Sequence, residues 1–394
     1  MLTPLLTHEV GSLAKPAWRV KAAAGRPLAE ADIRNARAWG ERLGVDGHER
    51  LLELLRQPSL AAPERREVTD WSSRYGLRFF ESAGVDVVYD GEQQRSEMYA
   101  WAIAHAAGFE RRGNVRSFDD KYYVKSAVTG PIALREPYHD WEFRLLHAAA
   151  QRPVKVPVTG PYTLAVWSFD ERYLGPADLT VPLAERRHQR TAARRRFVMD
   201  VARNLVRPNI EALLRLGATW IQIDEPGGST EPDEIALMAE AYNACVDGLE
   251  ATFSTHLCFS DYRLFFPGIA EMTGCAQFAV GFANDDGREL GTSDDARPGY
   301  QIIRSFRDLP GRPALGLGVV DIHTDFVEPP ELVRDRILYA ARIFGGPERL
   351  QIMPDCGLRT RSWEIAYRKL ASMTVGARLA RAALGLEPGK ESRE

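Results

Sequence analysis

The sequence predicts an α/β protein folded as a closed (β/α)8 barrel, the TIM barrel. Short runs rich in β-branched residues alternate with long helical patterns, which is typical of repeated βα units and a parallel sheet. Eight such units in one chain favour a closed barrel over an open sheet. The predicted strands lie at residues 5–10, 85–90, 154–159, 219–224, 251–258, 277–282, 314–320 and 350–353.

Helical patterns occupy the intervals between these strands. Helices are predicted over 199–216 and 233–250, the first from apolar residues at Val201, Leu205, Ile210, Leu213 and Leu214. Segment 109–150 is longer than a βα unit requires and contains a strand-like run at 124–131, so we expect an insertion after the second unit. Residues 1–385 are therefore predicted to form a single barrel domain, and residues 386–394 a disordered tail.

Composition narrows the class of protein. The 394 residues are 45% hydrophobic and 27% charged, which is ordinary for a soluble globular chain. The formal net charge of −3 gives no reason to expect a nucleic-acid partner. No basic apolar leader is present, and no apolar run approaches the roughly 18 residues of a membrane span. Four cysteines are too few for a disulfide framework and indicate a reducing, cytoplasmic setting.

Polar residues follow seven of the predicted strands. Because the carboxyl ends of barrel strands meet on one face, we expect these residues to line a common rim where active sites form. They are Gly11-Ser12, Asp90-Gly91-Glu92, Thr159-Gly160-Pro161, Asp224-Glu225-Pro226, His256 with Cys258, Asp321-Ile322-His323 and Asp355-Cys356.

Three of these residues indicate a metal site. His256 and Cys258 are two apart on one predicted strand, so the imidazole and the thiol project from the same face. Cys356 follows the last predicted strand. One imidazole and two thiolates suit zinc, and three protein ligands leave a position open for a substrate. The alternative interpretation is a core histidine beside inert buried thiols.

The motifs at these strand ends also carry a family likeness. The chain resembles the catalytic half of cobalamin-independent methionine synthase, within the wider uroporphyrinogen decarboxylase-like barrel superfamily. The resemblance runs from about residue 5 to 380, over most of the chain. It rests on Val10-Gly11-Ser12, Asp90-Gly91-Glu92, Val158-Thr159-Gly160-Pro161 through Trp167-Ser168-Phe169, Ile221-Gln222-Ile223-Asp224-Glu225-Pro226, His256-Leu257-Cys258, Val320-Asp321-Ile322-His323 and Pro354-Asp355-Cys356-Gly357-Leu358.

This resemblance implies a zinc-dependent methyltransferase. Zinc held by His256, Cys258 and Cys356 would activate the thiol of homocysteine for attack on the methyl group of a 5-methylfolate or a simpler donor. Free thiols have a pKa of about 8.5, and metal coordination deprotonates them. The leaving nitrogen requires a proton, and His323 matches the family's general acid. A histidine bonded to a loop carbonyl is the alternative for His323.

The resemblance also implies a substrate pocket. Glu92 and Asp224 would bind the amino group of homocysteine, and Gly11 and Ser12 its carboxylate. Trp167 would offer a face to a pterin ring. The alternatives are an ion pair of Glu92 with a residue such as Arg95, and core packing for Trp167.

One position departs from the family pattern. Gly281 stands where the family has a glutamate that is the fourth zinc ligand. Asp285, Asp286 or a water would then have to complete the site, and the departure leaves open a different thiol or donor. We expect Cys245 and Cys275 to be small buried hydrophobes.

Two alternatives to methionine synthesis remain at this stage. One is alkyl transfer to another thiol, such as coenzyme M, and the other is a non-catalytic homologue that binds thiols or folates. The arginines at 186, 190 and 194 share one predicted helix face. This face is either a solvated surface or a binding surface for an anionic tail such as folate polyglutamate. The sequence does not distinguish a monomer from a homodimer.

Overall fold

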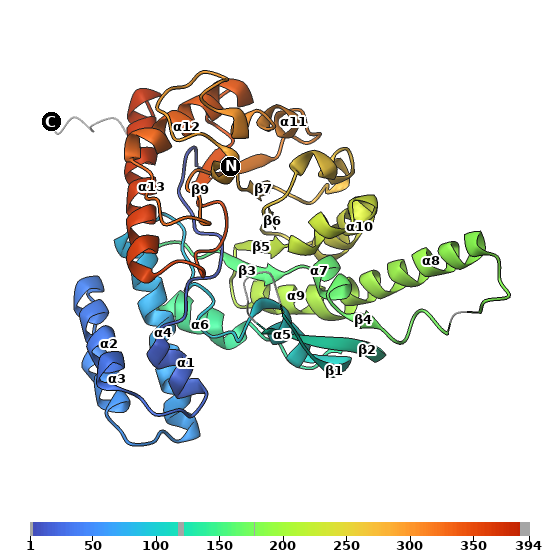
Figure 1. The fold of residues 1–394 in the computed structure, drawn as a ribbon, viewed down its shortest axis with the longest axis horizontal. Helices are drawn as coiled ribbons and strands as arrows, with labels where there is room; N and C mark the ends of the chain where they lie inside the picture. The colour runs from blue at the N-terminus through green and yellow to red at the C-terminus, as the bar shows by residue number, and fades with distance from the viewer. Residues whose placement is uncertain (1–2, 117–121, 177, 387–394) are drawn as a thin grey trace. The chain divides into compact units, whose positions relative to one another are not determined.

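The computed structural model describes residues 3–116, 122–176 and 178–386 (Figure 1). The chain divides into two compact units. The first unit comprises Met1–Gln94, Ala149–Val154 and Ala279–Glu394, and the second comprises Arg95–Ala148 and Lys155–Phe278. The predicted tail at 386–394 lies almost wholly outside the described residues, and the single-domain assignment stays a prediction.

Parallel strands form the centre of the second unit. Strand β5 (Trp220–Asp224) pairs with β3 (Val156–Thr159) and with β6 (Thr252–Leu257), both in parallel. All side chains of β3 and β5 are buried. One face of these strands carries apolar residues such as Ile221, Ile223 and Phe253, and the alternate positions carry polar ones.

Helices and short turns connect the strands of this unit. The helices are α5 (Met98–Ala104), α6 (Asp140–Ala149), α7 (Pro161–Val166), α8 (Leu183–Val201), α9 (Arg207–Arg215) and α10 (Ile235–Val246). Short 3₁₀ turns cover Pro226–Thr230, Pro232–Glu234, Tyr262–Phe265 and Gly268–Glu271. The predicted helix 199–216 is interrupted by a π-helical turn, Ala202–Val206. Pro208 follows that turn and cannot donate a backbone hydrogen bond, which accounts for the irregular turn before it.

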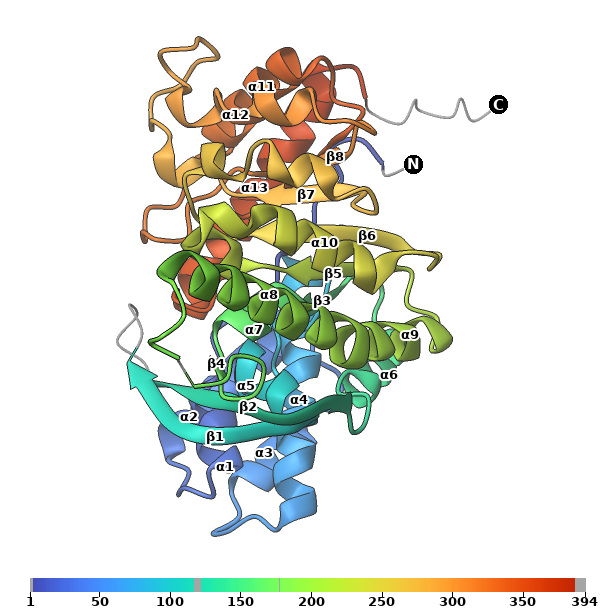
Figure 2. The same ribbon diagram turned by 90° about the vertical axis from the view of Figure 1, so that its right-hand side faces the viewer.

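The segment predicted as an insertion forms a long hairpin. Strand β1 (Ala106–Arg116) is antiparallel to β2 (Tyr122–Leu134), which contains the strand-like run at 124–131. Two irregularities in the register bend the ladder, between Ala107 and Phe109 and between Arg111 and Gly113. The two-residue strand β4 (Phe169–Asp170) pairs with β2 in parallel, and Figure 2 shows the curved hairpin.

The first unit combines helices with a second set of parallel strands. Its helices are α1 (Ala17–Ala23), α2 (Glu30–Leu43), α3 (His48–Leu55), α4 (Ala62–Ser82), α11 (Ile303–Arg307), α12 (Pro330–Phe344) and α13 (Trp363–Ala383). Strands β8 (Ala314–Gly318) and β9 (Leu350–Met353) are parallel, and 3₁₀ turns cover Ala283–Asp285 and Pro298–Tyr300. Strand β7 (Gln277–Val280) lies where the chain passes from the second unit to the first.

Six of the eight predicted strands are confirmed, and the first two are reduced to single bridges. Thr7 pairs with Ile352, His8 with Val87, and Val88 with Val154, all in parallel. Side-chain hydrogen bonds add to the backbone bonds here, because the Thr7 amide and hydroxyl both donate to Asp86 Oδ2, at 2.9 and 2.8 Å, while the Val87 amide donates to the Thr7 carbonyl. The structure therefore shows an α/β fold with parallel strands, while the closed barrel stays a prediction.

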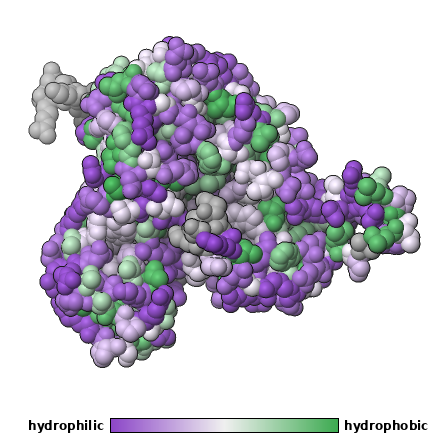
Figure 3. All heavy atoms as spheres, viewed as in Figure 1, coloured by the Kyte–Doolittle hydropathy of each residue, from purple (hydrophilic) through white to green (hydrophobic). Residues whose placement is uncertain are grey.

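The surface is largely hydrophilic on the face drawn in Figure 3, where hydrophobic atoms form smaller separate groups. Within the described ranges, no helix is both long and apolar enough to cross a bilayer.

A buried histidine stabilises the packing of the second unit. Asn209 on α9 accepts a hydrogen bond from the Tyr138 amide at 3.0 Å, and its Nδ2 lies 2.8 Å from His139 Nδ1. The amide of Asn209 therefore donates to a neutral imidazole. Burial, assisted by the positive charge of Arg95, lowers the pKa of His139 well below its ordinary value of 6.5.

This arrangement predicts a loss of stability in mild acid. Below a pH of about 6.5 the unfolded chain binds a proton at His139, whereas the folded chain keeps this imidazole neutral. The free energy of unfolding therefore falls as the pH falls. His139→Gln removes this contribution, and we expect its midpoint of urea unfolding to change less between pH 7 and pH 5. The exposed His188 provides the control, since His188→Gln should keep the wild-type pH dependence. Equal pH dependence in wild type and His139→Gln would contradict the assignment.

Candidate active site

The ends of β5 and β6 bring two of the predicted site residues together. Asp224, the last residue of β5, pairs in register with His256 on β6. Residues paired in parallel strands project from the same face, so the carboxylate and the imidazole lie on one side of the sheet. Cys258 follows two residues later and is partly exposed, while Asp224 and His256 are 6% and 4% exposed.

A buried carboxylate fixes this end of the sheet. Glu225 accepts hydrogen bonds from the backbone amides of Tyr162 (3.1 Å) and Thr163 (2.8 Å) and from the Thr163 hydroxyl (2.6 Å). Its own amide donates to the His256 carbonyl at 2.9 Å. Burial raises the pKa of Glu225 to about 7, although the hydrogen bonds from Thr163 and Tyr162 lower it. Glu225 is thus a structural residue that ties β5 to the first turn of α7 and to β6.

Trp167 ends helix α7 and is partly exposed. Its ring centroid is 6.4 Å from that of Tyr99, tilted by 55°. The Tyr99 hydroxyl lies 2.8 Å from the Ser168 hydroxyl, which anchors the turn after α7. The indole therefore has one packed side and some exposure to solvent, and both the pterin-facing and the core-packing roles remain compatible with its place.

In the first unit, Asp355 fixes the loop that carries Cys356. The Asp355 carboxylate accepts hydrogen bonds from the backbone amides of Phe282 (3.0 Å), Ala283 (3.0 Å) and Asn284 (2.8 Å) in the loop after β7. Burial raises the pKa of Asp355 to about 7, although these hydrogen bonds lower it. The neighbouring Cys356 is partly exposed.

The packing of Asp355 explains the glycine at position 281. A Cβ atom at Gly281 would lie 2.9 Å from both the Cβ and the carbonyl oxygen of Asp355. At Gly318, the end of β8, a Cβ atom would lie 2.3 Å from Asp355 Oδ1 and 2.7 Å from the Gly281 Cα. No side chain fits at 281 while Asp355 keeps this place.

Asp286, one of the proposed substitutes for the missing glutamate, is already engaged. Its carboxylate forms ion pairs with Arg297 and with Arg336, the latter at 3.0 Å, and its side chain is fully buried. Asp285 ends a 3₁₀ turn and is exposed. Neither aspartate belongs to the metal-binding group found among the described residues.

The loop after the first predicted strand lies against two other strand ends of the same unit. The Leu13 amide donates to the Gly91 carbonyl at 3.0 Å, and a Cβ atom at Gly357 would lie 2.4 Å from the Ser12 hydroxyl. Gly11 and Ser12 therefore lie beside the residue that follows Cys356.

Glu92 adopts a strained backbone conformation in a charged environment. Its φ is +60°, which is uncommon for a residue with a side chain, and it is 7% exposed. Its amide donates to Asp90 Oδ1 at 2.7 Å. Burial lowers the pKa of the nearby Lys15 to about 8, although the charge of Glu92 raises it. The carboxylate thus lies close to a cationic side chain that the sequence did not single out.

His323 projects from the loop after β8 and is exposed. Its Nδ1 lies 3.2 Å from Asp321 Oδ1, and its amide donates to the same oxygen at 2.8 Å. The Asp321 amide in turn donates to Glu328 at 2.7 Å. Burial raises the pKa of Asp321, but the hydrogen bonds and charge of His323 outweigh it and the net pKa is lowered. The partner of His323 shown here is a carboxylate, and Nε2 is the ring nitrogen directed away from it.

The four cysteines divide into two kinds. Cys245 and Cys275 are buried, as predicted, and burial raises the pKa of Cys275 to about 12. Cys258 and Cys356 are partly exposed. His256, Cys258 and Cys356 are the described residues whose imidazole and thiol groups could hold a metal ion. A thiol that stays protonated cannot ligate zinc, so the buried pair is unsuited to that role.

The arginine-rich segment forms part of helix α8, as predicted. Arg194 pairs with Glu234 at 3.1 Å, Arg195 pairs with Glu240, and Arg196 donates to the Tyr173 carbonyl at 3.3 Å. Arg187 and Arg190 are exposed. The carboxyl-terminal half of this basic face is therefore neutralised by acidic neighbours, as expected for a solvated surface.

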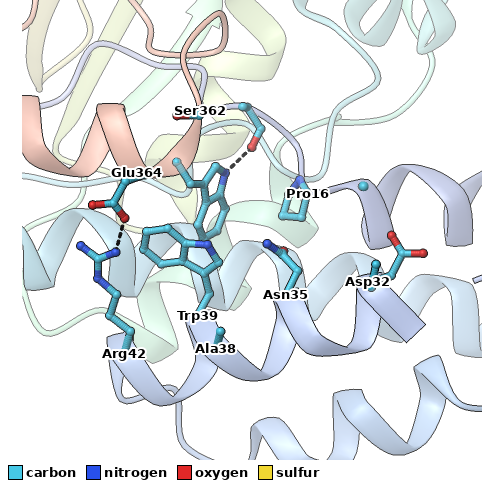
Figure 4. Close-up of a pocket in the computed structure, with 12 residues that line it drawn as sticks. Pro16, Asp32, Asn35, Ala38, Trp39, Arg42, Ser362 and Glu364 are labelled. Atoms are coloured by element: carbon cyan, nitrogen blue, oxygen red, sulfur yellow. Dashed lines mark hydrogen bonds and ion pairs between the residues drawn. The ribbon is translucent and has the colours of Figure 1, made fainter. Parts of the chain in front are cut away.

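The first unit also contains an open groove of about 730 Å³ (Figure 4). Its walls come from the segment before α1, from α2 and from the start of α13. The Trp363 indole donates to the Ala14 carbonyl at 2.7 Å, and Arg42 pairs with Glu364 across one end. This groove could not be predicted from the sequence, because its lining residues are far apart in the chain.

Comparison with known proteins identifies the family of this chain. Residues 49–379 match the family described as cobalamin-independent synthase, catalytic domain. This match defines the chain as the catalytic part of a synthase that works without cobalamin. The chain belongs to the cobalamin-independent methionine synthase family.

Relatives and solved structures support the same assignment. The methionine synthase of Thermoplasma acidophilum is 37% identical over 319 residues, covering 79% of this chain and 89% of the relative. That of Thermococcus kodakarensis is 35% identical over 349 residues, covering 87% and 92%. The fold is similar to that of a B12-independent methionine synthase from Shewanella sp. W3-18-1 in complex with selenomethionine. That similarity has a TM-score of 0.71 at 20% identity and covers 97% of this chain and 99% of the other.

The crowding at position 281 leads to a testable prediction. Gly281→Glu restores the residue type of the family but should destabilise the protein, because the new side chain collides with Asp355. Overpacking of this kind costs about 1–3 kcal/mol. We expect a lower thermal midpoint and no gain in bound metal. Gly175→Glu is the matched control, since no atom lies within 4 Å of a Cβ built there. A Gly281→Glu protein as stable as the wild type would show that the Asp355 loop is not confined as described.

Proposed function

We propose that this protein transfers a methyl group to the thiol of homocysteine and so forms methionine, in the cytoplasm. Membership of the cobalamin-independent methionine synthase family carries this proposal. The methyl donor is a methylated folate, such as 5-methyltetrahydrofolate, or a simpler methyl compound. We also propose that the parallel strands belong to a closed (β/α)8 barrel whose carboxyl ends carry the site.

The site's donor atoms suit zinc. His256, Cys258 and Cys356 would hold the ion, with one imidazole nitrogen and two thiolates, and leave one position for the substrate. When bound, zinc lowers the pKa of a coordinated thiol so that the sulfur is available as a thiolate at neutral pH. With Gly281 in place of a glutamate, the protein supplies no carboxylate from this position.

The amino acid part of homocysteine is recognised by charge. Asp224 and Glu92 bind the ammonium group, since two carboxylates directed at one ligand group call for a cation. Gly11 and Ser12 bind the carboxylate through a backbone amide and a hydroxyl. Asp224 and Glu92 are both nearly excluded from solvent. Charge interactions are stronger in such a buried site than in water. Trp167 contacts the ring of the methyl donor.

His323 supplies the proton that the leaving nitrogen requires. The Asp321 carboxylate accepts a hydrogen bond from Nδ1, which leaves Nε2 of the protonated ring to donate. The same carboxylate stabilises the imidazolium form before transfer. Asp321 is itself held by Glu328, so the ring is oriented by two successive carboxylates.

Metal analysis and a transfer assay test the proposed function. Purified wild type should contain about one zinc per chain and form methionine from homocysteine and 5-methyltetrahydrofolate. Cys356→Ser should lose most of the zinc and the activity, whereas Cys275→Ser should keep the zinc. Full zinc content in Cys356→Ser would remove that residue from the ligand set. Transfer to coenzyme M but not to homocysteine, or binding without transfer, would replace the proposed reaction by one of its alternatives.

The acid role of His323 has a separate test. His323→Asn should lower kcat by about 10²–10⁴-fold, the usual contribution of a general acid, with zinc content unchanged. Asp321→Asn should lower kcat less, by roughly tenfold, since the ring remains but loses its orientation. Asp325→Asn is the control in the same loop, where the carboxylate pairs with Arg361 at 2.6 Å. Loss of activity in the control but not in Asp321→Asn would refute the arrangement.

A further inference from the structure

Three buried polar side chains lie in a row that begins just before β3 and continues along one face of β5. Lys155 precedes β3, Gln222 lies in the middle of β5, and Asp224 ends that strand. Lys155 and Gln222 are 0% exposed and Asp224 is 6% exposed. Because side chains alternate along a strand, Gln222 and Asp224 project from the same face. The proposed function uses only the last of these three residues.

Hydrogen bonds connect the row in one direction. The Lys155 ammonium donates to Gln222 Oε1, and Gln222 Nε2 donates to Asp224 Oδ1 at 2.7 Å. An amide has one acceptor end and one donor end, while a lysine ammonium only donates. The lysine therefore fixes which end of the Gln222 amide faces Asp224, and that end is the donor.

The consequence for Asp224 is an oriented and stabilised carboxylate. A hydrogen bond to an ionised acceptor is stronger than one between neutral groups, and more so in a buried site. The bond engages Oδ1 and so restrains rotation of the carboxylate. The positive charge of Lys155 polarises the Gln222 side-chain amide, and that amide in turn acts on the Asp224 carboxylate.

We propose that Gln222, oriented by Lys155, is a positioning residue that makes Asp224 select thiols bearing an α-ammonium group. This inference rests on the proposed function of Asp224 and extends it by two residues. The ligand class is an amino acid thiol, in contrast to a thiol of the same length without the amino group. Gln222 and Lys155 do not contact the substrate and act only through the Asp224 carboxylate.

The experiment compares two ligands by calorimetric titration of the zinc-loaded full chain. One ligand is homocysteine, and the other is 4-sulfanylbutanoate, which has the same thiol and carboxylate but no amino group. Wild type should bind homocysteine more tightly. In Gln222→Leu the ratio of the two dissociation constants should fall about tenfold, because the loss of one hydrogen bond to a charged group affects only the ligand that Asp224 recognises.

Two further variants separate positioning from general stability. Lys155→Met should shift the ratio in the same direction, since the freed amide can turn its oxygen towards Asp224. Gln277→Leu replaces another fully buried glutamine, on β7, and should leave the ratio unchanged. A purely structural role for Gln222 would weaken both ligands equally, or lower the zinc content and thermal midpoint without moving the ratio.

The outcomes distinguish this inference from the proposed function. An unchanged ratio in Gln222→Leu, or a wild type that binds both ligands equally, overturns the inference even if methionine is formed. A wild type that discriminates between the ligands, loses discrimination in Gln222→Leu and forms no methionine supports the inference and overturns the proposed reaction.

Discussion

The register of β5 against β6 is the constraint on which the chemistry of the second unit depends. Paired in parallel, Asp224 and His256 share a face, and Ile221, Ile223 and Phe253 fill the opposite face. A slip of one residue would turn both polar side chains to the apolar face and bring the apolar ones to the polar face. The packing of the sheet therefore fixes the relative orientation of a carboxylate and an imidazole.

Two buried carboxylates perform a similar task in the two units. Glu225 accepts backbone hydrogen bonds from the first turn of α7, and Asp355 accepts three from the loop after β7. Each lies beside a residue with a proposed chemical role, Asp224 or Cys356. Burial raises the pKa of both carboxyl groups, and the backbone amides oppose that rise. Segments at strand ends are thus held by internal acceptors next to the residues with proposed chemical roles.

Much of the fold could be predicted because strands and helices differ in period. The segments at 219–224 and 251–258 show the alternation of a half-polar strand, and both were placed within two residues. The first two strands were overestimated because they form only isolated bridges, and the Thr7 amide donates to the Asp86 side chain, which composition does not reveal. The division into two units depends on contacts between distant segments and was not accessible.

Candidate site residues could be proposed from the sequence where their own side-chain chemistry suggests a role, and less so where the role depends on neighbours in the fold. His256, Cys258 and Cys356 could be named from their ligand chemistry and their place at strand ends. Gln222 lies in a motif that was recognised in the sequence, but no role could be assigned to its side chain. The reason is that its partner Lys155 is 67 residues away in the chain. The glycine at 281 was visible as a departure, but its cause lies in Asp355, which reaches it only in the folded chain.

Residues 281, 318 and 355 consequently restrict which side chains each of the three positions can hold. As long as an aspartate occupies the space above the two glycines, every substitution at 281 or 318 meets its side chain. A carboxylate at 281 would require a smaller residue at 355 or a different place for the Asp355 side chain. The three backbone amides that now donate to Asp355 would then need other acceptors. A single mutation at 281 therefore cannot place a carboxylate there without displacing Asp355.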